Sequence, residues 1–118
     1  MATILVVDDA AFMRMRCAKL LKEQGYDVLE AENGAVALDV YKESKPDAVL
    51  MDITMPEMDG IAALKALLDI DPNVRVAMVT AMGQQSIIMD AIKSGAKDFV
   101  VKPFEKERVL QAVERLLA

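Results

Sequence analysis

Five polar residues that could act together chemically each follow a short apolar run. They are Asp8 and Asp9 after ILVV, Asp52 after DAVLM, Thr80 after VRVAMV, and Lys102 after FVV. Such runs, rich in β-branched residues, are typical of strands buried on both faces of a parallel sheet. In an open α/β sheet the carboxyl ends of the strands lie along one edge, where ligands bind. We therefore expect three carboxylates, a hydroxyl and an ammonium group to converge in a metal-assisted phosphoryl-acceptor site.

The elements that must position these side chains alternate five times along the chain. We expect strands at about 3–8, 27–32, 47–52, 74–80 and 98–101, and helices at about 11–24, 35–44, 60–70, 84–93 and 105–117. Gly25 and Gly95 follow the first and fourth helices at left-handed C-cap positions. Five βα units with short connections predict an α/β fold, a doubly wound five-stranded parallel sheet with helices on both faces. These elements are expected to form one domain, residues 1–118.

Composition limits the class of protein. With 118 residues, 54% hydrophobic and 28% charged, the chain fits a soluble globular protein with one core. No apolar run approaches the roughly 18 residues that span a bilayer, and the early first strand leaves no room for a signal peptide. A net charge of −5 argues against nucleic-acid binding. The single cysteine, Cys17, indicates a reducing cytoplasm, and its helical spacing with apolar neighbours predicts a buried core thiol.

The sequence contains no histidine, which excludes several kinds of site. Ser–His and Cys–His nucleophile pairs, His-ligated zinc and an internal phosphohistidine are all ruled out. A histidine, if the mechanism needs one, must come from another protein. The first strand-to-helix turn, DDAAF, also lacks the glycines that a dinucleotide-binding turn or a P-loop needs near phosphate.

The acidic residues at the strand ends need compensating positive charge, because three neighbouring carboxylates cannot all stay ionised without it. Lys102 offsets one charge, and Mg²⁺ (or Mn²⁺) suits oxygen ligands while keeping several waters. Asp52 would then attack phosphorus in line and form an acyl phosphate. The metal, Lys102 and the Thr80 hydroxyl would meet the three equatorial oxygens. Taken singly, Asp9 could merely N-cap the first helix, and Asp52 could be a turn-forming residue.

Four segments resemble the signature motifs of the response-regulator receiver family of two-component signalling. They are ILVVDDAAFMR, VLMDITMPEMDG, VTAMG and GAKDFVVKPF, in the family's order and spacing along the whole chain. The resemblance implies a flavodoxin-like sheet with strand order 2-1-3-4-5. It also implies that Asp52 is the phospho-acceptor. The other roles it implies are metal ligation by Asp8, Asp9, Asp52 and the Thr54 backbone carbonyl, phosphoryl contact by Lys102, switching by Thr80, and a cis Lys102–Pro103 peptide bond.

Phe99 occupies the position of the family's switch aromatic. In the family, this ring rotates inward as the hydroxyl at the position of Thr80 moves toward the phosphoryl group. Plain core packing on a short strand explains Phe99 equally well. Because Phe lacks the hydroxyl of Tyr, packing would have to carry the signal. Met82, two residues beyond Thr80, is expected to hinder the hydrolytic water and to lengthen the life of the phosphoryl group.

The leading hypothesis is a stand-alone response regulator that accepts a phosphoryl group from the phosphohistidine of a sensor kinase or phosphotransfer protein. It would signal through the fourth helix, fifth strand and fifth helix, as a cytoplasmic monomer that binds neither nucleic acid nor membrane. DAAFMRM and AMGQQ resemble chemotaxis regulators that bind the flagellar motor switch. We expect no enzyme with an external substrate, although the protein would catalyse its own phosphorylation and dephosphorylation.

Three alternatives share parts of this pattern. A phosphorelay shuttle has the same fold and site. An Asp-nucleophile phosphatase of the haloacid dehalogenase type uses the same Asp, Thr, Lys and Mg²⁺ chemistry, but places its nucleophile after the first strand, whereas Asp52 follows the third. A flavodoxin-like flavin binder shares only the fold, and the acidic first turn opposes it.

Overall fold

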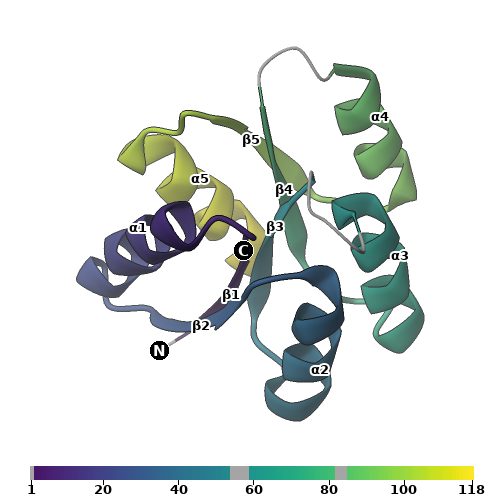
Figure 1. Ribbon diagram of the computed structural model, residues 1–118, viewed down its shortest axis with the longest axis horizontal. Coiled ribbons are helices and arrows are strands. Elements are labelled where there is room, and N and C mark those ends of the chain that lie inside the picture. Colours follow the sequence, from purple (N-terminus) through teal and green to yellow (C-terminus); the bar gives the residue numbers. More distant parts are fainter. Residues whose placement is uncertain (1, 54–58, 82–84) are drawn as a thin grey trace.

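The computed structural model describes residues 2–53, 59–81 and 85–118, in which strands and helices alternate (Figure 1). The strands are β1 (Thr3–Val7), β2 (Asp27–Ala31), β3 (Ala48–Asp52), β4 (Val76–Ala81) and β5 (Asp98–Lys102). The helices are α1 (Ala11–Glu23), α2 (Gly34–Ser44), α3 (Gly60–Ile70), α4 (Gln85–Ser94) and α5 (Lys106–Leu117). Each expected element is confirmed, with ends displaced by at most two residues.

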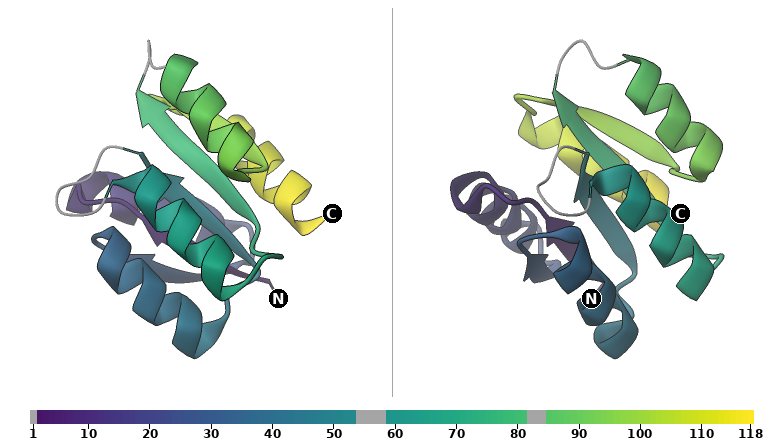
Figure 2. Two further views of the ribbon diagram at one scale, coloured as in Figure 1. Left: turned by 90° about the vertical axis from the view of Figure 1, so that its right-hand side faces the viewer. Right: turned by 45° about the vertical axis from the view of Figure 1, so that its right-hand side comes forward.

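The strands pair in parallel in the order β2-β1-β3-β4-β5. This confirms the predicted doubly wound sheet and its 2-1-3-4-5 order. Helices α1 and α5 cover one face, and α2, α3 and α4 cover the other (Figures 1 and 2). Because the strands are parallel, the carboxyl ends of β1, β3, β4 and β5 share one edge of the sheet, as the site requires.

The apolar core is divided by the sheet into two clusters. Central strand β3 is buried along its whole length and contributes to both. Leu5, Met51 and Leu64 belong to the cluster under α2, α3 and α4, whereas Cys17 and Leu50 belong to the cluster under α1 and α5. Cys17 is 5% exposed, which confirms the predicted core thiol. Burial raises its pKa to about 12, so the thiol stays protonated at neutral pH.

The helix ends follow the local sequence. Asn33 caps α2 by accepting from the Val36 N–H, and Asp59 caps α3 by accepting from the Ala62 N–H, both at 2.8 Å. The glycines after α1 and α4 have positive φ angles, 90° at position 25 and 121° at position 95, as expected. None of the helices among the described residues has the length and apolar character needed to cross a membrane.

Candidate functional site

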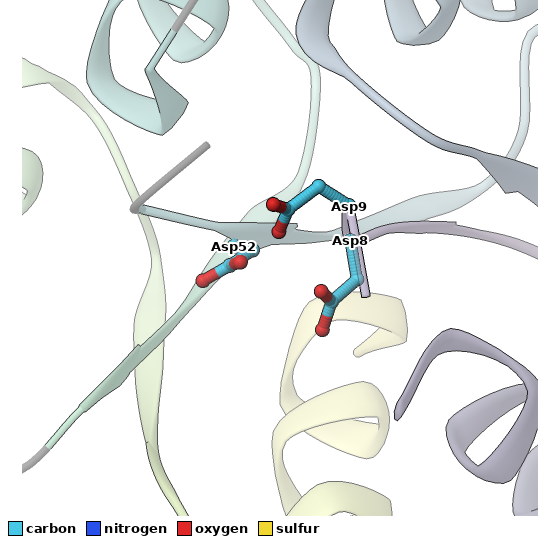
Figure 3. Close-up of side chains that lie close together, drawn as sticks. All are labelled: Asp8, Asp9 and Asp52. Carbon is cyan, nitrogen blue, oxygen red and sulfur yellow. The ribbon is translucent and has the colours of Figure 1, made fainter. Parts of the chain in front are cut away.

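Three carboxylates meet at the carboxyl edge of the sheet. Asp8 and Asp9 follow β1, and Asp52 ends β3, which lies next to β1. One oxygen from each of the three side chains lies within 4.8 Å of the other two (Figure 3). Asp8 and Asp52 are each 6% exposed, whereas Asp9 is open to solvent. The predicted convergence of these acids from two strands is therefore present in the structure.

Lys102 approaches the acids from the end of β5, across β4. Its Nζ lies 3.0 Å from Asp8 Oδ2 and 3.5 Å from Asp52 Oδ2. Burial alone would lower the pKa of this ammonium, but the hydrogen bond to Asp8 and the charges of Asp52 and Asp8 raise it above its ordinary value. Lys102 thus stays charged between the two buried carboxylates. The Lys102–Pro103 bond is cis, as the family resemblance implied.

Among the carboxyl groups of the described residues, Asp52 has the pKa that is raised most. Burial raises its pKa to about 6, and the neighbouring charges of Asp8 and Asp9 add to this effect, while Lys102 acts in the opposite direction. A divalent cation fits the remaining need for positive charge. The three acids supply the hard oxygen ligands that Mg²⁺ prefers, and one oxygen of each lies near enough to the other two to bind the same ion.

The turn that carries Asp8 and Asp9 is fixed by hydrogen bonds of Asp8. Its N–H donates to the Ala31 carbonyl of β2 at 3.2 Å, and its Oδ1 accepts from the Ala10 N–H at 2.9 Å. The alternative that Asp9 N-caps the first helix is wrong. Ala10 occupies the N-cap position of α1, and among the described residues no side chain caps that turn. The position of Asp9 beside the other acids therefore has no helix-capping explanation.

The two expected switch residues lie on adjacent strands. Thr80 is completely buried in β4, and its hydroxyl donates to the Ala81 carbonyl at 3.3 Å. Phe99 on β5 is half-buried, and the Arg108 guanidinium of α5 lies 6.0 Å from the centre of its ring. Thr54 and Met82, the remaining residues of the sequence-based interpretation, lie outside the described residues.

A third buried carboxylate of the described residues, Asp98, joins β5 to α5. Arg108 Nη2 lies 3.0 Å from Asp98 Oδ1, and Arg115 Nη1 lies 3.6 Å from Oδ2. Arg108 also donates to the Phe99 carbonyl. Burial by itself would raise the pKa of Asp98, but hydrogen bonds from Arg108 and the Phe99 N–H, together with the two arginine charges, hold it below its ordinary value.

Gly60, the first residue of α3, also lies beside the site and was not expected there from the sequence. Its N–H donates to the Ile53 carbonyl at 2.7 Å. A methyl group on Gly60 would collide with the Asp52 carbonyl oxygen and would lie 2.7 Å from Ile53 Cα. Glycine therefore lets the first residue of α3 pack directly against the backbone of Asp52.

Comparisons with known proteins agree with this geometry. Residues 4–114 match the family described as the response regulator receiver domain. The chain is 59% identical to the chemotaxis protein CheY of Bacillus subtilis over 97% of this chain and 96% of that protein. It is 54% identical to CheY of Thermotoga maritima, over 96% and 95%.

A solved structure is also similar, the CheX–CheY–BeF3–Mg²⁺ complex from Borrelia burgdorferi. The TM-score is 0.93 at 35% identity, and the match covers 99% of this chain and 90% of that one. The family match and the full-length relatives lead to the same assignment. The chain belongs to the response regulator receiver domain family, as a CheY-like chemotaxis signalling protein rather than an enzyme.

Proposed function

We propose that Asp52 is the residue that accepts the phosphoryl group, taken from a phosphohistidine of a sensor kinase or phosphotransfer protein. The observation that carries this proposal is the incompletely neutralised cluster of Asp8, Asp9 and Asp52 around the Lys102 ammonium. Such a cluster attracts a cation and, through it, a phosphoryl group. Because the chain contains no histidine, the phosphohistidine must belong to the donor protein.

In the proposed reaction a carboxylate oxygen of Asp52 forms a bond to phosphorus as the bond from phosphorus to the donor nitrogen breaks. The product is an acyl phosphate on Asp52 and a free histidine on the donor. Lys102, with Nζ 3.5 Å from Asp52 Oδ2, is placed to contact an equatorial oxygen of the transferring group. Thr80 would contact a second one once its hydroxyl turns toward the site.

The metal in this proposal is Mg²⁺, which Mn²⁺ would replace. Asp8, Asp9 and Asp52 would hold it, with the Thr54 backbone carbonyl as a further ligand implied by the family resemblance. When bound, the cation would neutralise charge on the carboxylates and on the phosphoryl oxygens. The presence of Mg²⁺ in the name of the Borrelia complex supports this choice.

For the output, we propose the surface formed by α4, β5 and α5, which we call the output face. Met89 and Ile92 of α4 are 60% and 44% exposed, which gives this surface apolar side chains for a protein partner. Phe99 would transmit the phosphorylation state of Asp52 to it through Thr80. The flagellar motor switch is the partner we propose, and the CheX protein named with the Borrelia relative supports protein contacts as the means of signalling.

The same proposal includes the broader properties expected from the sequence. Residues 1–118 would form one receiver domain that acts as a monomer in the cytoplasm. Its partners would be proteins, with neither nucleic acid nor membrane among them. The acidic net charge of −5 supports the exclusion of nucleic acid.

Phosphorylation with a small-molecule donor tests the central claim. The protein is incubated with acetyl phosphate and Mg²⁺, and its intact mass is measured for wild type, Asp52→Asn and Asp39→Asn. Asp39 is an exposed carboxylate on α2 and serves as the matched control. We expect wild type and Asp39→Asn to gain one phosphoryl group, and Asp52→Asn to gain none. A full mass gain in Asp52→Asn, or none in wild type, would contradict the assignment.

A further inference from the structure

Arg14 connects three elements beside the acidic cluster. It lies near the start of α1, where its N–H donates to the Ala10 carbonyl at 2.9 Å. Its guanidinium extends back toward the sheet, and Nη1 donates to the Asp8 backbone carbonyl at 2.8 Å. Its Nε donates to Glu30 Oε1 of β2 at 3.1 Å. The Arg14 side chain is 18% exposed, and its planar guanidinium group is held by two hydrogen bonds, one from Nε and one from Nη1.

Asp8 is the first residue after β1, and its carbonyl lies at the start of the turn that leads into α1. The β1–β3 pairing extends only to Val7, so this carbonyl lies beyond the paired region of the two strands. Arg14 supplies its hydrogen bond from the next element, while the Ala10 N–H holds the Asp8 side chain. Asp9 lies between the two fixed residues. The backbone position of Asp9, from which its carboxylate extends toward the other two acids, is therefore set by the turn that Arg14 anchors.

We infer that Arg14 is a positioning residue for cation binding. It holds the turn at residues 8–10 so that the carboxylates of Asp8 and Asp9 face that of Asp52 before a cation arrives. The inference rests on the proposed function, because it takes these three acids as the cation's ligands. Groups that orient metal ligands commonly change metal affinity by about 10- to 100-fold when they are removed.

The charge of Arg14 and its positioning role should change the affinity for a divalent cation in opposite directions when Arg14 is removed. Arg14 carries a positive charge beside the acids, and by electrostatics alone its removal would tighten cation binding. If Arg14 instead holds the turn in place, its removal would leave the turn less ordered in the absence of a cation. Part of the free energy of cation binding would then be used to order the turn, so the cation would bind more weakly. A weaker cation affinity in a variant that has lost a positive charge therefore identifies positioning.

The experiment measures Mn²⁺ binding by electron paramagnetic resonance of free Mn²⁺, with no phosphodonor present. We expect Arg14→Ala to raise the dissociation constant by about tenfold. Arg14→Met, which keeps an unbranched apolar side chain, should show the same weakening and serves if Arg14→Ala does not fold. Arg14→Lys should recover part of the affinity, because an ammonium can donate to the Asp8 carbonyl. Arg16→Ala removes the same charge from an exposed position of α1 and should bind within about twofold of wild type.

Two outcomes would overturn the inference, and they separate it from the proposed function. If wild type binds Mn²⁺ and gains a phosphoryl group, but Arg14→Ala and Arg14→Met bind Mn²⁺ as tightly or more tightly, the positioning role is wrong and the proposed function stands. If wild type neither binds Mn²⁺ nor gains a phosphoryl group, both are wrong. Thermal unfolding by circular dichroism verifies that each variant is folded.

Discussion

At the scale of single residues, Asp52 shows how burial prepares a carboxylate for reaction. The Asp52 side chain is almost fully buried, and the single positive charge of Lys102 lies close to two carboxylates, those of Asp52 and Asp8. The resulting pKa of about 6 lies close enough to neutral pH to make the carboxylate more basic than an exposed one, while leaving it mostly ionised. A more basic carboxylate is a better nucleophile toward phosphorus.

The rate of phosphorylation should therefore depend on pH. At a limiting Mg²⁺ concentration, we expect the initial rate with acetyl phosphate to fall as pH drops through about 6, because protonated Asp52 is not nucleophilic. Saturating Mg²⁺ should move this decline to lower pH, since a bound cation favours the ionised carboxylate. Initial rates of mass gain between about pH 5 and pH 8 test this. A decline centred at the same pH at both Mg²⁺ concentrations would contradict it.

The raised pKa also means that ionised Asp52 destabilises the cation-free fold. The folded protein binds this proton more tightly than the unfolded chain, so stability is lost as pH rises from about 4 to about 6. Asp52→Asn should increase the free energy of unfolding at neutral pH by about 1–2 kcal/mol, after solvent screening is taken into account.

Urea unfolding in the presence of a chelator measures this gain. The gain should disappear below about pH 4, where the carboxyl group is protonated in both states. Asp39→Asn, at an exposed position, should be nearly neutral at every pH. If Asp52→Asn is less stable than wild type at neutral pH, the prediction is wrong. The contacts of the Asp52 side chain would then stabilise the fold by more than the burial of its charge destabilises it.

The site could be predicted from the sequence as far as strand ends determine it. Asp8, Asp52 and Lys102 were placed correctly because each ends or follows a recognisable apolar run in a parallel sheet. Arg14 and Gly60 could not be found in this way. Their importance comes from how closely α1 and α3 approach the backbone beside the acids, and no local pattern encodes such a distance.

At the scale of elements, two arginines of α5 pair with a buried carboxylate of β5, in addition to the apolar contacts of the helix with the core. Asp98 begins β5, and its carboxylate is only 6% exposed, yet Arg108 and Arg115 of α5 both reach it. Arg108 in addition contacts the ring and the backbone carbonyl of Phe99. The proposed output face therefore contains a charged contact that ties the position of α5 to the strand carrying the expected switch residue.

Loss of the Asp98 charge should weaken this attachment. We expect Asp98→Asn to lower the free energy of unfolding by about 2 kcal/mol at neutral pH, because charge-assisted hydrogen bonds are lost. The folded pKa of Asp98 lies below its ordinary value, so its contribution is present above about pH 4 and is lost as pH falls through the lower folded pKa.

The measurement is urea unfolding at neutral and acidic pH, with Asp69→Asn on the exposed surface of α3 as the control. The difference in free energy of unfolding between wild type and Asp98→Asn should become smaller at acidic pH. The Asp69→Asn protein should have the same free energy of unfolding as wild type at both pH values. A difference that is constant with pH would point to packing rather than charge as its origin.

At the scale of the whole molecule, alternation of apolar runs with helical periodicity was sufficient to predict the class of fold. The element boundaries were close because glycines at 25 and 95 mark helix ends through their backbone conformation. The order of the strands in the sheet could not be predicted from this alternation. Right-handed crossovers left several arrangements possible, and the 2-1-3-4-5 order came from the family resemblance and is confirmed by the pairings.

The whole fold should respond to a divalent cation. A cation that binds the folded protein and relieves repulsion among three carboxylates adds about 1.4 kcal/mol at roughly ten times its dissociation constant, or about 5 °C in the unfolding midpoint. Thermal unfolding of wild type with Mg²⁺ and with a chelator measures this increment. Asp9→Asn should reduce this increment, because one of the proposed cation ligands is lost. An equal increment in Asp9→Asn would mean that Mg²⁺ stabilises the protein elsewhere.

The ion pair between Lys102 and Asp8 has a consequence for how the protein is made. The two residues are 94 positions apart, so during synthesis the three aspartates emerge from the ribosome long before the ammonium that partly neutralises them. A chain cut before β5 would keep Asp8, Asp9 and Asp52 but would lack Lys102, whose ammonium lies between Asp8 and Asp52 in the folded protein.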